Sequence, residues 1–517
     1  MISGNVHTRD LKHNRPYYVI NYAKQNMADT VTDFENCRWV AHNVSREFLD
    51  SDFFLLVKSI KELEGLHCDW EALDIDFTIN DDGVKIIHAE KLEDISEVPR
   101  AMSDKEFIDT KSIAKCIYLD THHMLSDGAY LNLLRLLGNN PKPLEFSLLK
   151  EFIDTGGWND VITCMGYEGN ENELFFRIGN KPYTSLNNMF LGLMPVGLRV
   201  MTKYKLENYY EQYVRDNKSR GQTFEKSVLF DSYAPDTAER LMGLKEYGFA
   251  DDEITELTEA LKNQTISVVE NYSFMNDKYN QGLEKMKKLR EKIYESEPFS
   301  ESNSMKLNRY VEKLVVAIRN YVAPALMYQE RCVNISKGYC EILEPDDKDT
   351  REMLYKLSRE MWTNVKRAER YEGIFNIRMN ARGNKDVWDI PFGDEKSSCK
   401  ISTDTIKKAL EQTKIDLEPE LFVEFISNSV ESEKKIMQEF IDDVRLVMGI
   451  IIRLGGLLGI EYEDMSYLEV RDLLSYHSRD SYIHIIQSRR HMYHANTYVV
   501  LPKLICDVGD IDIIDER

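Results

Sequence analysis

The sequence predicts an α+β protein with a strand-containing N-terminal part, a mixed central part and a mostly helical C-terminal half. Three observations indicate this class. Residues 73–92 alternate apolar and polar side chains around a turn sequence, which is typical of a β-hairpin. Residues 46–66 carry apolar side chains at helical spacing. Residues 254–321 carry them close to heptad spacing in two successive segments, which predicts a long helical hairpin.

Length and charge limit the classes of function. The chain has 517 residues, of which 66 are lysine or arginine and 88 are aspartate or glutamate, giving a net charge of −22. This acidic excess argues against nucleic acid and against an anionic membrane surface as partners. The eight cysteines form no C-x-x-C pair and the N-terminus has no apolar signal sequence, so we expect reduced thiols and a cytoplasmic protein.

The chain divides into three regions by pattern. Residues 1–98 are expected to form an α/β subdomain, with a strand at 17–22 behind a proline turn. Residues 99–240 mix helical and extended patterns, broken by proline and glycine. Residues 241–517 are expected to be helical. Pro324 is expected to end or kink the second helix of the hairpin, because proline has no backbone N–H to donate.

The predicted β-hairpin carries the most informative polar residues. Asp74 and Asp76 alternate with Leu73, Ile75 and Phe77, which places both carboxylates on one face of a half-buried strand. Two carboxylates on one face fit a hard cation such as Mg²⁺, shared between protein and phosphate oxygens. The alternative is an ordinary strand whose aspartates face solvent.

The register of the hairpin decides which residues join that face. With a regular four-residue loop, His88 lies opposite Ile75 on the apolar side. One bulge residue beside Gly83 would instead pair His88 with Asp76 and bring Glu90 to the polar face as well. The sequence leaves both registers open.

Several segments occur in an order that suggests a known family. They read GNVHTRD at 4–10, PYYVINY at 16–22, DTVT at 29–32, DIDF at 74–77 and IHAEK at 87–91. Together they resemble the end of the nucleotide-binding (ATP-grasp) domain of phosphoenolpyruvate-utilising enzymes, the phosphoenolpyruvate synthase and pyruvate phosphate dikinase group. A looser resemblance to the central region of this family covers residues 137–198.

The resemblance implies a partial ATP-grasp-like subdomain with Mg²⁺ and ATP as cofactors. In the family this region flanks the triphosphate, so Thr8, Arg9 and Asp10 become candidate phosphate-side residues, and Asp74 and Asp76 candidate metal ligands. For Arg9 the alternative is a charge in a solvated loop.

Two further positions depart from the family pattern. His88 stands where the family has glutamine, and Glu90 stands where it has arginine. Both are candidate cofactor-side residues by position. A carboxylate in place of arginine would repel phosphate rather than bind it.

The adenine-binding lobe and the phosphohistidine domain of the family have no counterpart in this sequence. We therefore expect one half of a split ATP- or phosphoenolpyruvate-dependent phosphotransferase, which needs a protein partner or a second copy to complete the ATP-grasp region. The alternative is a catalytically degenerate member that acts as an interaction or regulatory scaffold. Either way we expect an open sheet edge or face in residues 1–98.

Overall fold

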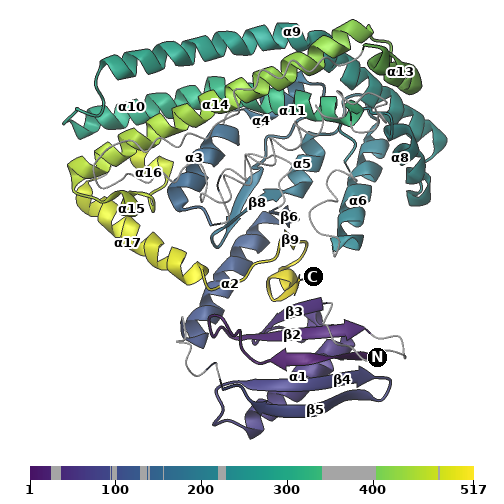
Figure 1. Ribbon diagram of the computed structural model, residues 1–517, viewed down its shortest axis with the longest axis vertical. Coiled ribbons are helices and arrows are strands. Elements are labelled where there is room, and N and C mark those ends of the chain that lie inside the picture. The colour runs from purple at the N-terminus through teal and green to yellow at the C-terminus, as the bar shows by residue number, and fades with distance from the viewer. Residues whose placement is uncertain are drawn as a thin grey trace.

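The computed structural model describes residues 1–24, 36–93, 95, 102–127, 137, 140–154, 157–218, 229–340, 403–475 and 478–516. The fold is α+β with a helical C-terminal half, as the sequence predicts, and the described residues form two antiparallel sheets (Figure 1). The DTVT segment at 29–32 lies outside the described residues.

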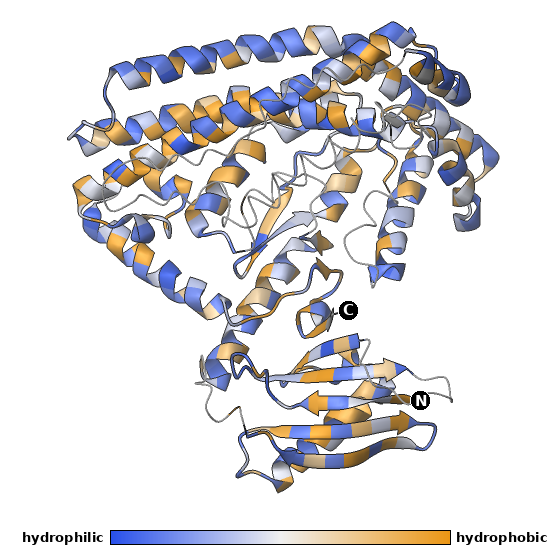
Figure 2. Ribbon diagram, viewed as in Figure 1, coloured by the Kyte–Doolittle hydropathy of each residue, from blue (hydrophilic) through white to orange (hydrophobic). Residues whose placement is uncertain are grey.

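Six antiparallel strands form the N-terminal sheet in the order β10-β3-β2-β1-β4-β5. Their bounds are β1 (Ile2–His7), β2 (Tyr17–Lys24), β3 (Asn36–Ala41), β4 (Leu73–Asn80), β5 (Gly83–Lys91) and β10 (Ile513–Glu516). Helix α1 (Ser51–Leu66) covers one face of this sheet, after the short 3₁₀ helix η1 (Arg46–Phe48). Figure 2 shows the alternation of hydrophobic and hydrophilic residues along β4.

Helix α1 and the sheet bury a small core of their own. Asp50 begins the helix by accepting a hydrogen bond from the Phe53 backbone N–H at 3.0 Å. The buried side chains of α1 then meet alternate residues of the strands. The core comprises Val6, Tyr18, Ile20, Tyr22, Val40, Phe53, Leu56, Val57, Ile60, Leu73, Ile75, Phe77 and Ile79.

The β4–β5 hairpin combines the two registers that the sequence left open: beside the turn Ile79 pairs with Val84, as in the regular register, and beyond a bulge the second register applies. Asp76 pairs with His88, and Asp74 pairs with Glu90. The bulge that produces this register lies in the middle of β5, where Ile87 has no partner, and not beside the turn. The side chain of Ile87 is 66% exposed.

Helix α2 (Asp104–Thr121) leads from the N-terminal sheet to the central region (Figure 1). There a four-stranded antiparallel sheet has the order β7-β8-β6-β9. Its strands are β6 (Leu125–Ser126), β7 (Phe175–Ile178), β8 (Lys181–Ser185) and β9 (Leu504–Ile505). The neighbouring helices are α3 (Pro143–Ile153), α4 (Trp158–Cys164), α5 (Leu186–Gly192), α6 (Val200–Asp216) and α8 (Thr237–Gly243), followed by the 3₁₀ helix η5 (Leu244–Tyr247).

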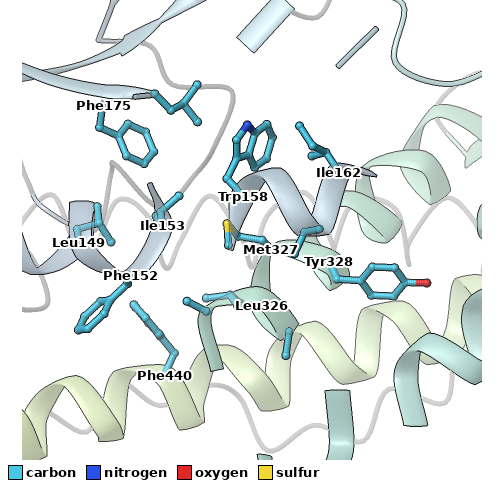
Figure 3. Packing of buried hydrophobic residues seen from close by; sticks show 14 of the residues in the cluster. Leu149, Phe152, Ile153, Trp158, Ile162, Phe175, Leu326, Met327, Tyr328 and Phe440 are labelled. Carbon is cyan, nitrogen blue, oxygen red and sulfur yellow. The ribbon is translucent and has the colours of Figure 1, made fainter. Parts of the chain in front are cut away.

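The helical half shares one continuous hydrophobic core with the central region. Figure 3 shows part of this core, where the rings of Phe152 and Phe440 meet edge to face at 5.9 Å between centroids. The helices are α9 (Asp251–Glu295), α10 (Ser304–Ala317), α11 (Ala323–Cys340), α13 (Thr403–Thr413), α14 (Pro419–Leu458), α15 (Tyr462–Met465), α16 (Val470–Leu474) and α17 (Arg479–Asn496). Among the described helices, none combines the length and the hydropathy needed to cross a bilayer.

Helices α9 and α10 form the long hairpin that the heptad spacing predicts (Figure 1). Pro324 does not end its second helix. The chain passes through a π-helical turn (Ile318–Val322) and continues as α11 to Cys340. A π turn shifts the hydrogen-bond pattern by one residue, which accommodates a proline that cannot donate.

After α17 the chain returns to both sheets. Residues 497–516, the C-terminal segment, contribute β9 to the central sheet and β10 to the edge of the N-terminal sheet. Between these strands, the 3₁₀ helix η7 (Val508–Ile511) contacts α2. The region expected to be helical therefore ends in strands that join both sheets.

A buried ion-pair cluster attaches the C-terminal segment to α2. Asp512 is fully buried, and its carboxylate lies 3.0 Å from the ammonium of Lys111 and 2.5 Å from that of Lys115. Lys111 is also fully buried, and its ammonium lies over the rings of Tyr17 and Phe107, 5.1 Å and 5.7 Å from their centroids. Burial lowers the pKa of Lys111 to about 8.

Candidate functional site

The face of the N-terminal sheet opposite α1 changes character across its width. Towards β2 and β3 it is apolar, and Tyr17, Val19 and Trp39 pack there against Phe107 and Val499. Over β1, β4 and β5 the same face carries polar side chains. The sheet thus presents a covered apolar half and a polar half.

The polar half consists of two cross-strand rows. Residues directly opposite each other in antiparallel strands point to the same face. One row runs through His7, Asp74 and Glu90, and the other through Asn5, Asp76 and His88. We call these six residues the carboxylate face: Asn5, His7, Asp74, Asp76, His88 and Glu90.

Five of the six residues of the carboxylate face contact another member of it. The Asn5 amide donates a hydrogen bond to Asp74 Oδ1, and His7 Nε2 lies 3.7 Å from the same oxygen. His88 Nε2 lies 3.3 Å from Glu90 Oε2 at the edge of the sheet. Asp76 lies between Asn5 and His88 in its cross-strand row. It is exposed, and it forms no hydrogen bond or ion pair with the residues that the structure describes.

The carboxylate face does not hold a complete set of metal ligands. Within the described part of the chain, no group of three or more histidine, cysteine, aspartate or glutamate side chains converges closely enough to hold a metal ion. Asp74 and Asp76 could supply two oxygens to a hard cation, and Asn5 a third. A Mg²⁺ ion needs about six oxygens, so water, a nucleotide or another chain would have to provide the rest.

Thr8 and Arg9 lie at the end of β1, but their side chains are buried and hold other parts of the chain. Thr8 Oγ1 accepts a hydrogen bond from the Leu73 backbone N–H at 2.8 Å. The Arg9 guanidinium donates to Asp104 Oδ2 at 2.8 Å and to the Asn14 carbonyl at 3.1 Å. Arg9 is therefore neither a solvated loop charge nor a free phosphate ligand. It ties the β1–β2 loop to the start of α2.

Asp10 is also buried and organises the loop between β1 and β2. Its carboxylate accepts hydrogen bonds from the backbone N–H groups of Lys12 and His13, both at 3.2 Å. Arg15 Nε donates to the same carboxylate at 2.6 Å. An aspartate that binds N–H groups two and three residues later is a common turn-forming arrangement. Of the seven site residues that the sequence indicated, the structure brings four together on the carboxylate face and places Thr8, Arg9 and Asp10 beneath the adjoining loop.

A partly buried imidazole lies under this loop. His42 Nε2 donates to the Thr8 carbonyl at 2.7 Å, and its ring stacks on Tyr18 at 4.2 Å between centroids. Burial lowers the pKa of His42 to about 4, so the imidazole is neutral at pH 7. On the other side, Tyr18 donates to Glu64 Oε2 at 2.7 Å, and burial raises the pKa of Glu64.

Sequence reasoning missed Asn5 and His7 as members of the site. The alternation of Gly4, Asn5, Val6 and His7 was the available signal. Their position became evident only because β1 lies between β2 and β4, an arrangement that no local pattern specifies.

Comparison with known proteins does not identify the chain. None of the protein-family models searched matches the sequence, and a search of curated proteins finds no significant match.

Proposed function

We propose that the chain is a phosphoenolpyruvate-synthase-like component of an ATP-dependent phosphotransferase, whose site is completed by a partner chain or a second copy. The observation that carries the proposal is the carboxylate face. Asp74 and Asp76 lie two residues apart on one side of β4, beside the Asn5 amide. Paired carboxylates repel each other and are stabilised by a bound divalent cation, which in turn binds phosphate oxygens.

The charge of this face indicates what the partner must supply. None of its six residues is lysine or arginine, and phosphate oxygens are usually bound by cationic donors. Arg9, the arginine at the family's motif position, is engaged with Asp104. The cations that neutralise a triphosphate would therefore come from the partner. Free thiols at the six described cysteines fit the cytoplasmic location that is part of the proposal.

The burial of Arg9 and the charge of Glu90 favour a second candidate. In this alternative the chain is a catalytically degenerate relative that keeps the scaffold as an interaction or regulatory subunit. A carboxylate beside a triphosphate weakens binding, and an arginine already paired inside the protein cannot compensate. The two candidates differ in whether the assembled complex binds Mg-ATP.

Calorimetric titration of Mg-ATP separates the candidates. The titration uses the purified chain alone and its complex with the product of the neighbouring reading frame. We expect no binding and no release of AMP or phosphate by the chain alone. In the complex we expect binding that Asp76→Asn abolishes and that Asp81→Asn, a matched change in the exposed hairpin turn, leaves intact.

The same titration tests the role of Glu90. Glu90→Arg replaces a repulsive charge by a charge-assisted contact worth about 1.5–3 kcal/mol, so affinity in the complex should rise about tenfold or more. A complex that forms but never binds Mg-ATP supports the scaffold. Tight Mg-ATP binding by the wild-type chain alone would contradict both candidates, and no gain from Glu90→Arg would show that this position does not face the nucleotide.

A further inference from the structure

A pocket of about 420 Å³ lies on the other side of the N-terminal sheet, between α1 and the loop that precedes it. This volume falls within the range of about 300–1,000 Å³ that is common for small-molecule sites. We call it the α1 pocket. It is lined by Val44, Arg46, Leu49, Phe54, Val57, Lys58, Lys61 and Glu62.

The floor of the α1 pocket is apolar. Phe54 and Val57 come from one side of α1, and Val44 and Leu49 come from the facing loop. Val57 is 3% exposed and belongs to the core beneath the helix, so that core supports this part of the floor. The other three side chains are partly buried, which leaves apolar surface available to a ligand.

The rim of the α1 pocket is positively charged. Lys58 lies 4.0 Å from Glu62, one turn further along α1, so these two charges offset each other. Arg46 and Lys61 form no ion pair with the described residues. The Arg46 guanidinium lies over the Phe54 ring, 4.6 Å from its centroid, which holds the cation above the apolar floor. Two cations without an ion-pair partner among the described residues therefore border this pocket, in a chain whose net charge is −22, although Lys61 also interacts electrostatically with Glu64.

We propose that the α1 pocket binds a small amphipathic anion. Its apolar body, of about one or two rings or a short alkyl chain, contacts the floor. Its carboxylate, sulfonate or phosphate group lies between Arg46 and Lys61. Charge complementarity selects this ligand class over a neutral apolar molecule, because both unpaired rim charges have the same sign. The pocket and the carboxylate face lie on opposite sides of the sheet, so the inference does not depend on the function proposed above.

The first test uses two fluorescent probes with similar ring systems and the full chain. The anionic probe is anilinonaphthalene sulfonate, and the neutral probe is phenylnaphthylamine. We expect Arg46→Gln combined with Lys61→Gln to lower the affinity for the anionic probe at least about tenfold, because two charge-assisted contacts are lost. The affinity for the neutral probe should change by no more than about twofold. The matched control is Lys287→Gln combined with Lys288→Gln, which removes two exposed charges from α9 and should change neither affinity.

A second variant and a competition assign the probes to this pocket. Val44→Trp fills the floor from the loop side and should weaken both probes. Octanoate should displace the anionic probe, and octanol should not. The proposal would be overturned if the Arg46→Gln/Lys61→Gln variant and the α9 control lost the same amount of affinity for the anionic probe. It would also be overturned if neither the Arg46→Gln/Lys61→Gln variant nor Val44→Trp changed that affinity. An equal loss of the neutral probe in the Gln pair would also overturn it.

Discussion

Replacing Asp512 by asparagine should destabilise the joint between the C-terminal segment and α2. The carboxylate of Asp512 faces the ammonium groups of Lys111 and Lys115 at 3.0 Å and 2.5 Å, and the side chains of Asp512 and Lys111 are 0% exposed. Removing one partner of a buried ion pair leaves an uncompensated buried charge, which costs about 3–5 kcal/mol of the free energy of unfolding.

The reciprocal change should cost less. Lys111→Met leaves Asp512 paired with Lys115 and places an apolar side chain beside the rings of Tyr17 and Phe107. Because no charge is stranded, we expect a loss of about 1–2 kcal/mol. Asp512→Asn is expected to cost more free energy of unfolding than Lys111→Met, because it leaves the Lys111 ammonium buried without its partner.

The pH dependence provides a second signature. The pKa of Lys111 is about 8 in the folded protein and 10.5 when unperturbed, so the unfolded chain binds more protons between these values and stability rises with pH. In Asp512→Asn the folded pKa should be lower still, so the rise should begin at a lower pH than in the wild type. Lys111→Met should abolish this contribution.

The assay is urea-induced unfolding at several pH values, with hydrogen exchange of peptides from β3 and β10 as the local readout. We expect faster exchange at both strands in Asp512→Asn. Two results would show that an unpaired Lys111 ammonium does not cause the loss of stability. One is an equal loss of free energy of unfolding in Lys111→Met and Asp512→Asn, and the other is the same pH dependence in the wild type and Asp512→Asn.

Three further predictions concern the N-terminal sheet. Gly4→Ala would place a β-carbon 2.1 Å from the Asn21 carbonyl oxygen, so it should cost at least about 1–3 kcal/mol in thermal unfolding; an unchanged melting temperature would contradict this. His42 has a pKa of about 4 in place of 6.5, so the free energy of unfolding should fall as pH falls from 6.5 to 4. In urea unfolding at several pH values, His42→Asn should remove this pH dependence; if the wild type and the variant show the same dependence, other groups cause it. Ile87→Lys, at the exposed bulge of the free edge strand, should keep stability and reduce concentration-dependent association in sedimentation velocity; unchanged association would place the contact elsewhere.

The elements that the sequence predicted well are those whose signals are local. The alternation around Asp74 and Asp76 predicts β4, and heptad spacing predicts α9 and the helix that follows it. Even the hairpin register was limited to two options. The bulge at Ile87 could not be located, because a bulge depends on how the whole strand fits its neighbour and not on one residue type.

The environment of the motif residues was not predictable in the same way. Arg9 is separated from its partner Asp104 by most of the N-terminal subdomain, and nothing near either residue indicates the pair. The same holds for Lys111 and Asp512. A sequence motif indicates which residues stand near a site, whereas burial decides whether their charges are available. That distinction separates Arg9 from Asp76, which is exposed and unpaired within the described chain.

The position of β10 has a consequence for the order in which the protein can fold. Strand β3 and its outer partner β10 are separated along the chain by residues 42–512, which must be synthesised before the two strands can pair. Domains generally fold as units during synthesis, N-terminal ones first. Here the N-terminal sheet stays incomplete while residues 42–512 are translated, and the outer edge of β3 lacks its partner β10 throughout that interval. During that interval β3 is a natural binding site for a chaperone, and a delay in translation would prolong the exposure of this edge.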